Sequence, residues 1–326
     1  MTRRLPSRTA RRAAVLLTAV FTAMSAPDLE AQRGRGGPQS DDLREAAAFV
    51  RARNKPEALQ AIRRELARQP TSTAAANLLD TIGEGAEARR VFQRQIDEAR
   101  DPSARAAAER AMAMSYAFEG DCANTITYEQ RVIDYWVTRE AAEPQNAFYQ
   151  EGEMANEGAR VCIDAGDLDT AEAWYRKGTA LGLKEPEPKT HPTSLWDYRL
   201  AHALGRIAAR RGNVAEATRQ IAAARQALDS DPTMAEQQER FFPYLVGYVA
   251  LYTNDLAKAE TELERAIAMP GNENDPFLRA LLGMTYEKLG RATEARTAYE
   301  AAYERATAHN PPAAFTRPFT REKLGW

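Results

Sequence analysis

The sequence predicts an all-α fold, an α-solenoid of about seven antiparallel helix pairs. Two observations carry this prediction. A Gly, Asn or Asp turn followed by an Ala-rich helical segment recurs about seven times, at intervals of about 29 to 46 residues; such intervals are typical of helix-pair repeats. The composition, 44% hydrophobic and 28% charged residues, is that of a folded domain.

The turns predict where each helix ends and the next begins. Clear copies start at Gly166 (GDLDTAEAWYRKG), Gly212, Asn254 and Gly290, and weaker copies start at Asn54, Gly83 and Gly120. A Gly or Asn ends a helix in the left-handed conformation, and the Asp or Asn that follows caps the next helix. Each copy is therefore expected to join two antiparallel helices.

Small residues recur at one place in the second helix of the clear copies. They are Ala171, Ala217, Ala259 and Ala295, and larger side chains follow four residues later: Tyr175, Ile221, Leu263 and Tyr299. The small side chain lets two helices approach, and the larger one fills the space beside it. Three Asp-Pro pairs, at 101–102, 231–232 and 275–276, are predicted helix starts.

The last copy, residues 281–306 (LLGMTYEKLGRATEARTAYEAAYERA), resembles a tetratricopeptide repeat. The matching positions are Leu282, Gly283, Tyr286, Gly290, Ala295, Tyr299 and Ala302. The resemblance extends over roughly residues 41–308. It implies a right-handed superhelix of stacked helix pairs, the first helix of each pair lining a concave face. It also implies binding of a protein or peptide rather than catalysis.

The two ends of the chain leave this pattern. Residues 1–31 combine five Arg with a short apolar run and small residues, which predicts a signal peptide cleaved after Ala26 or Ala31. The alternative is an N-terminal anchor helix, but the run is short for a membrane span. The Gly-rich segment 32–40 is a predicted flexible linker. The mature protein is expected in the periplasm or secreted, with no membrane insertion.

Two further segments lie outside the repeats. The Pro-rich stretch 182–193 is predicted to be non-helical, with Ser194 capping the helix after it. The tail, 309–326, has four large apolar residues in a polar setting. Because a solenoid needs a cover for its last apolar face, the tail is predicted to pack on the final pair.

Several function classes find no support. Lys and Arg total 44 against 46 Asp and Glu, and no basic stripe indicates nucleic-acid binding. The three histidines, His191, His202 and His309, have no second ligand at metal-site spacing, so neither a metal nor a cofactor is expected. His191 is predicted to be a solvated loop residue. No nucleophile motif is present, and the chain is predicted not to be an enzyme.

The two cysteines are expected to form a disulfide. Cys122 opens the second helix of the third pair, and Cys162 lies near the end of the following helix. In a stacked array these helices are antiparallel neighbours, and an exported protein meets an oxidising compartment. The alternative is two buried reduced thiols.

The repeat pattern also predicts the residues of the concave face. An Arg/His/Asn zone would adjoin a Tyr stripe with helical spacing. The candidate ligand-binding residues are Asn156, Arg160, Arg199, His202, Arg206, Tyr244, Tyr248 and Tyr252. The rival interpretation of the Tyr stripe is core between neighbouring repeats.

The sequence thus favours a non-catalytic scaffold that binds a protein or peptide segment of unknown identity in the cell envelope. Two alternatives stay open. One is a structural module whose groove is occupied by its own tail. The other is an all-α enzyme with a barrel of helix pairs, which an inward cluster of carboxylates would favour.

Overall fold

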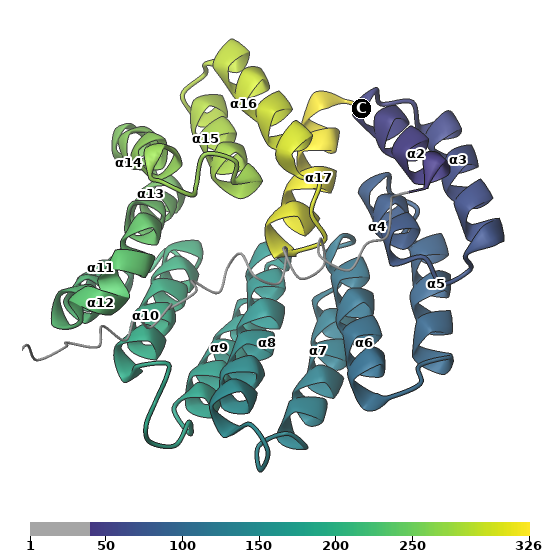
Figure 1. The fold of residues 1–326 in the computed structure, drawn as a ribbon. Helices are drawn as coiled ribbons and strands as arrows, with labels where there is room; N and C mark the ends of the chain where they lie inside the picture. The colour runs from purple at the N-terminus through teal and green to yellow at the C-terminus, as the bar shows by residue number, and fades with distance from the viewer. Residues whose placement is uncertain (1–39) are drawn as a thin grey trace, which may run out of the picture. The chain divides into compact units, whose positions relative to one another are not determined.

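The computed structural model describes residues 40–326, and in this part of the chain it is helical and contains no strand. The predicted signal peptide, and the linker up to residue 39, lie outside the described residues. The predicted solenoid of antiparallel helix pairs is confirmed (Figure 1). The pairs are α2 (Asp41–Arg51) with α3 (Lys55–Arg68), α4 (Thr73–Thr81) with α5 (Gly85–Asp97), α6 (Pro102–Ala117) with α7 (Cys122–Val137), α8 (Pro144–Ala165) with α9 (Leu168–Gly182), α10 (Thr193–Arg210) with α11 (Val214–Ser230), α13 (Phe242–Tyr252) with α14 (Leu256–Ala268), and α15 (Pro276–Lys288) with α16 (Ala292–Arg305).

A left-handed residue lies at the turn inside every one of these pairs. These residues are Arg53, Gly83, Gly120, Gly166, Gly212, Asn254 and Gly290. The sequence pattern predicted this conformation for Gly or Asn. In the first pair, however, Arg53 adopts it, while Asn54 accepts a hydrogen bond from the Glu57 amide and caps α3. The turn conformation is therefore retained even where its preferred residue is replaced.

Side-chain caps and small residues support the pairing as predicted. The three Asp-Pro pairs begin helices, and Asp101 accepts a hydrogen bond from the Ala104 amide at 2.8 Å. The recurring alanines are buried. At the same crossing in the last pair, a Cβ added to Gly283 would lie 2.5 Å from the Tyr299 ring, so that position requires glycine. Close approach of the two helices thus depends on the small residues.

The structure corrects the expected start of the fifth pair. Helix α10 begins at Thr193, and no side chain caps it. The Ser194 hydroxyl instead donates to Asp231 Oδ2 at 2.6 Å, and so links the start of α10 to the end of α11. The segment before α10 is non-helical, as predicted.

The sixth pair is preceded by two short elements, α12 (Pro232–Gln238) and the 3₁₀ helix η1 (Glu239–Phe241). The Asp231-Pro232 start therefore opens a short helix, and α13 begins only at Phe242, with Pro243 in its first turn. Pro fits a first turn because its missing N–H would have no partner there. The aromatic-rich α13 is accordingly short, and nine of its eleven residues are buried.

The tail forms a helix, α17 (Pro311–Leu324), which begins with the same type of signal as the other Pro-started helices. Asn310 accepts a hydrogen bond from the Ala313 amide at 3.1 Å, and Pro311 follows it. Helix α17 packs on α15 and α16, the last pair, and also contacts α6 and α8 (Figure 1). The tail therefore joins the end of the array to its third and fourth pairs.

Candidate functional site

The side of the first helices that faces α17 is called the inner face here. Successive first helices contact one another from α10 through α13 to α15, and α17 reaches α6, α8 and α15. The eight candidate ligand-binding residues lie on α8, α10 and α13. The structure brings six of them into one interacting group; Asn156 lies outside it, and Arg199 has other partners.

Arg206 is the centre of this group. It is 4% exposed, and its Nη1 and Nη2 donate to the hydroxyl oxygens of Tyr244 and Tyr175 at 2.9 and 2.8 Å. Tyr248 lies beside it, with the guanidinium 5.9 Å from the ring centroid. One arginine thus links α9, α10 and α13.

His202 lies one turn before Arg206 on α10. Its Nε2 is 3.3 Å from the Phe241 carbonyl oxygen, which can only accept, so this nitrogen carries the proton. Burial, followed by the nearby Arg206 guanidinium, holds the pKa of His202 well below its usual value. His202 is therefore neutral and serves as a donor within the group.

The predicted ligand-contacting Tyr stripe requires correction. Tyr244 and Tyr248 are 7% and 1% exposed, and burial raises the pKa of both. The Tyr244 ring contacts His202 of the fifth pair and Phe277 of the seventh, with centroids 5.0 and 5.9 Å apart. Because the first helices of these pairs flank the short α13, its rings fill the space between them. Tyr244 and Tyr248 therefore belong to the core between neighbouring repeats, which was the rival interpretation of the stripe.

The other candidates are half-buried. Tyr252 packs on Tyr248, with centroids 4.6 Å apart, and the Arg210 guanidinium lies over its ring. The guanidinium carbon of Arg160 lies 4.8 Å from the centroid of the Phe277 ring. Arg199 pairs with Glu153 and donates to the Tyr149 hydroxyl. The side-chain oxygen of Asn156, Oδ1, is buried and has no hydrogen-bond partner. None of these side chains lines an open groove by itself.

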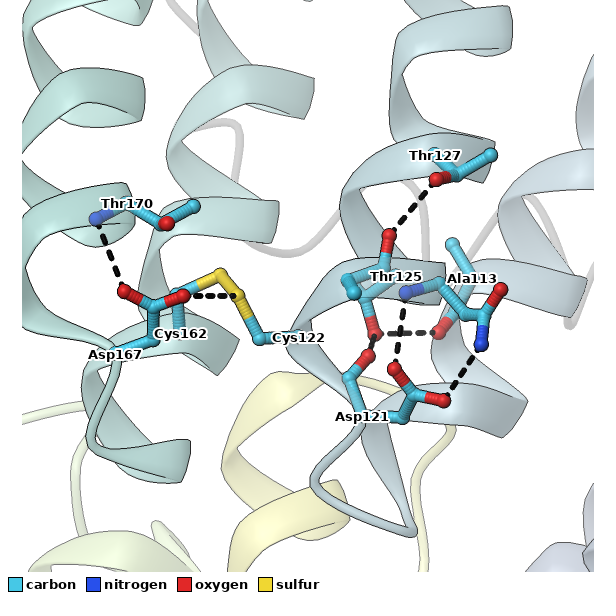
Figure 2. Close-up of a disulfide and its surroundings, with 10 residues drawn as sticks. Ala113, Asp121, Cys122, Thr125, Thr127, Cys162, Asp167 and Thr170 are labelled. Carbon is cyan, nitrogen blue, oxygen red and sulfur yellow. Dashed lines mark hydrogen bonds between the residues drawn. A yellow bond between two sulfur atoms is a disulfide. The ribbon is translucent and has the colours of Figure 1, made fainter.

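A disulfide joins Cys122 and Cys162, whose Cα atoms lie 4.8 Å apart (Figure 2). It links the start of α7 to the last turn of α8. Asp121 caps α7, and Thr125 donates to the carbonyl oxygens of Asp121 and Ala113, which ties α7 to α6. Figure 2 also places Asp167, the cap of α9, beside the sulfur of Cys122, at 3.9 Å. The third and fourth pairs are therefore held together at one end.

Sequence reasoning missed the surface beneath α17, called the tail seat here. Its apolar residues are Ala113, Met114 and Ala117 of α6, Phe118 directly after α6, and Val161 of α8, which cluster with Ala306, Ala313 and Ala314. Figure 1 shows the lower end of α17 above the C-terminal ends of α6 and α8, and α17 contacts both helices. The Asn310-Pro311 pair predicts that the tail begins a helix. No pattern in the repeats indicates that this helix packs on α6 and α8.

Polar contacts fix the tail to the second pair as well. His309 Nε2 lies 2.9 Å from Asp80 Oδ2, and the ring stacks on Phe118. Arg317 donates to the carbonyl oxygens of Tyr303 and Thr81 at 2.8 and 3.3 Å. No carboxylate pairs with it in the described chain, and burial lowers the pKa of Arg317 to about 10. The tail is thus held by hydrogen bonds as well as by apolar contacts.

The tail seat is incompletely filled. A cavity of about 100 Å³ lies between α17 and the second and third pairs, lined by Asp80, Gly83, Phe118, Arg317 and Arg321 among others. A second, of about 240 Å³, opens between α17, α6 and α8, with Phe118, Val161, Phe315 and Phe319 in its lining. The buried Thr316 Oγ1 has no hydrogen-bond partner.

The prediction for His191 is also wrong. This residue, expected to be solvated, stacks on Tyr149 with ring centroids 3.8 Å apart. Its Nδ1 lies 2.9 Å from the buried carboxylate of Glu185, which also accepts from the Thr190 hydroxyl. The Pro-rich segment is therefore folded around Glu185 rather than extended into solvent.

Within residues 40–326, no group of three His, Cys, Asp or Glu side chains is placed to hold a metal ion. No helix in that range combines the length and apolar character that a membrane span requires.

Comparison with known proteins locates a family match at the C-terminal end of the array. A tetratricopeptide repeat model matches residues 278–309, which cover all but the first two residues of α15, the whole of α16 and the segment after it. The chain carries a tetratricopeptide repeat. The resemblance predicted from residues 281–306 is therefore confirmed.

Among solved structures, the tetratricopeptide repeat domain of P58(IPK) is similar to this chain at 15% identity. The alignment covers 87% of this chain and 88% of that domain, with a TM-score of 0.32. No curated protein matches the sequence.

Proposed function

We propose that this protein is an exported, non-catalytic scaffold of the cell envelope that binds a helical segment of another protein on its inner face. One observation carries the proposal: an amphipathic helix, α17, already packs across the first helices of the third, fourth and seventh pairs. Recognition of a helix in a groove uses this type of apolar surface. The tetratricopeptide repeat, a protein-binding unit, supports the same function.

The features of the tail seat also favour exchange of its occupant. Two cavities flank α17, Thr316 is buried without a partner, and Arg317 is buried without a carboxylate. A partner helix that filled the cavities and brought no unpaired polar or charged group into the tail seat would bind more favourably than α17, because Thr316 and Arg317 leave the seat with the tail. The preferred partner is therefore a helix with small residues facing α6 and no unpaired charge near Thr81.

A second candidate is a purely structural module. The occupation of the inner face by residues 311–324 favours it, because a permanently bound tail leaves no seat for a partner. The two candidates differ in one property, namely whether the tail seat exchanges its helix.

The test uses a chain that ends at Thr307 and a labelled peptide of residues 309–326. We expect saturable binding by fluorescence anisotropy, and an Ala314→Glu peptide should bind at least tenfold more weakly, because Ala314 is buried. A Glu322→Gln peptide is the matched control, since Glu322 is exposed. Absence of binding would remove the helix-receptor proposal.

Exchange is then tested with envelope extract. A protein that the truncated chain captures, and that the 309–326 peptide displaces, supports the scaffold. If the peptide displaces nothing, the structural module is favoured.

Export rests on separate observations. Residues 1–31 have the layout of a signal peptide. The disulfide between Cys122 and Cys162 fits an oxidising compartment. Cell fractionation followed by N-terminal sequencing tests this part, and an intact Met1 in the cytoplasm would contradict it.

A further inference from the structure

The charge around Arg206 is not balanced. Arg206 is buried, and both of its assigned hydrogen bonds go to neutral tyrosine hydroxyls. Its Nε is buried without a hydrogen-bond partner, and within residues 40–326 no carboxylate forms an ion pair with it. A buried guanidinium normally has an anionic partner, because desolvation of an unpaired charge is costly.

Two more guanidiniums lie in the same region. The Nε of Arg160 is also buried without a hydrogen-bond partner. Arg210 donates to the Ile163 carbonyl oxygen at 3.0 Å and to the Tyr248 hydroxyl at 3.5 Å. Arg160, Arg206, Arg210, Tyr175, Tyr244 and Tyr248 are called the Arg–Tyr cluster here.

Asp164 is the carboxylate that interacts electrostatically with all three arginines. Burial raises the pKa of Asp164 to about 6, against the opposing effect of Arg160, Arg206 and Arg210. His202 adds no positive charge, because its pKa lies well below the usual value. Three positive charges thus face at most one negative charge.

We propose that the Arg–Tyr cluster binds a small dianionic oxyanion of the phosphate or sulfate type. The two negative charges of such an ion would balance the two arginine charges that Asp164 leaves uncompensated. Guanidinium groups donate in a planar fork that matches oxyanions. The Tyr175 and Tyr244 hydroxyls accept from Arg206 and so keep their own O–H groups to donate. Arg160 and Arg210 are half-buried, so part of each side chain is accessible from solvent.

This site does not depend on the proposed function. Its residues lie on α8, α9, α10 and α13, whereas the apolar tail seat lies on α6 and at Val161 of α8. Failure of the peptide experiment would leave the ion site untouched, and the reverse also holds.

The experiment measures thermal unfolding of the full chain in chloride, phosphate and sulfate at matched ionic strength. We expect a saturable rise of several degrees with phosphate or sulfate, because a ligand of the folded state stabilises it by mass action. Calorimetric titration should give one ion per chain. Equal effects of chloride, or no saturable rise with either oxyanion, would overturn the proposal.

Variants then locate the ion. Arg160→Met should weaken phosphate or sulfate binding at least tenfold, whereas Arg176→Met, an exposed arginine paired with Glu172, should leave it unchanged. Asp164→Asn keeps the size of the side chain and removes the competing carboxylate, so affinity should rise. Equal binding by the Arg160→Met and Arg176→Met variants would show a non-specific salt effect and overturn the assignment.

Discussion

The two parts of the inner face are filled in different ways. The tail seat is apolar and is covered by a helix from the far end of the chain. The Arg–Tyr cluster is polar, and its side chains hydrogen-bond between neighbouring helices. The same repeat geometry therefore produces one surface that a separate helix covers and one that side chains of neighbouring helices bridge. Only the first offers a seat for another helix.

The largest expected effect comes from removing the cover. A chain that ends at Thr307 exposes the tail seat, and we expect a loss of about 5 kcal/mol in the free energy of unfolding, from the apolar area returned to water. For a domain of this size, the melting temperature should fall by roughly 10 °C or more. Thermal unfolding measures this, and the truncated chain should also bind a hydrophobic dye. An unchanged melt would mean that α17 contributes nothing to the fold.

This contrast also separates what the sequence predicts from what it does not. The turns at Gly166 and Gly212, the buried Ala171 and Ala217, and the pairing of Cys122 with Cys162 depend on local patterns or on neighbouring helices. Such features follow from the period of the repeat.

The rest depends on long-range contacts that no period encodes. The contact of His309 with Asp80 joins residues 229 positions apart, and nothing in either segment indicates the other. The Tyr stripe shows a different difficulty. Helical spacing places Tyr244 and Tyr248 on one side of α13, but whether that side is open depends on how closely the fifth and seventh pairs approach.

The disulfide lies at the boundary between the two parts of the inner face. On α8, Cys162 is next to Val161 of the tail seat and two residues from Asp164. Replacing both cysteines, Cys122→Ala with Cys162→Ala, should cost up to about 4 kcal/mol, because the bond closes a loop across 40 residues of sequence. Denaturant unfolding measures the loss, and thiol titration of the unfolded wild-type chain is the control. Two free thiols in exported wild-type protein would contradict the assignment.

The Arg–Tyr cluster is tested at its most buried ring, that of Tyr248. Tyr248→Ala should destabilise the protein by roughly 3 kcal/mol, as expected for truncation of a large core side chain. Tyr252→Ala is the matched control on the same side of α13, and it should cost about 1 kcal/mol, because Tyr252 is only half-buried. Thermal unfolding of both variants gives the comparison. If both changes cost equally little, the ring of Tyr248 is not part of the core.

The smallest expected effect concerns a polar group that neither arrangement satisfies. Glu151 of α8 is 0% exposed, and both of its carboxylate oxygens are buried without a hydrogen-bond partner. Burial, with Glu140 as the next contribution, raises the pKa of Glu151 from 4.5 to about 7. Between these pH values the folded chain binds more protons than the unfolded chain, so stability falls as the pH rises through this range.

Glu151→Gln removes this pH dependence while keeping the size of the side chain. At pH 8 the variant should be more stable than the wild type by about 2 kcal/mol, since each pKa unit corresponds to about 1.4 kcal/mol and part of the shift relaxes. Well below pH 4.5 the two proteins should unfold alike, because Glu151 is then protonated in both states. Denaturant unfolding at about pH 3.5, 6 and 8 measures the difference. The exposed Glu236→Gln serves as control and should show no such trend. A variant less stable than the wild type at pH 8 would mean that the ionised Glu151 has a partner in the folded chain.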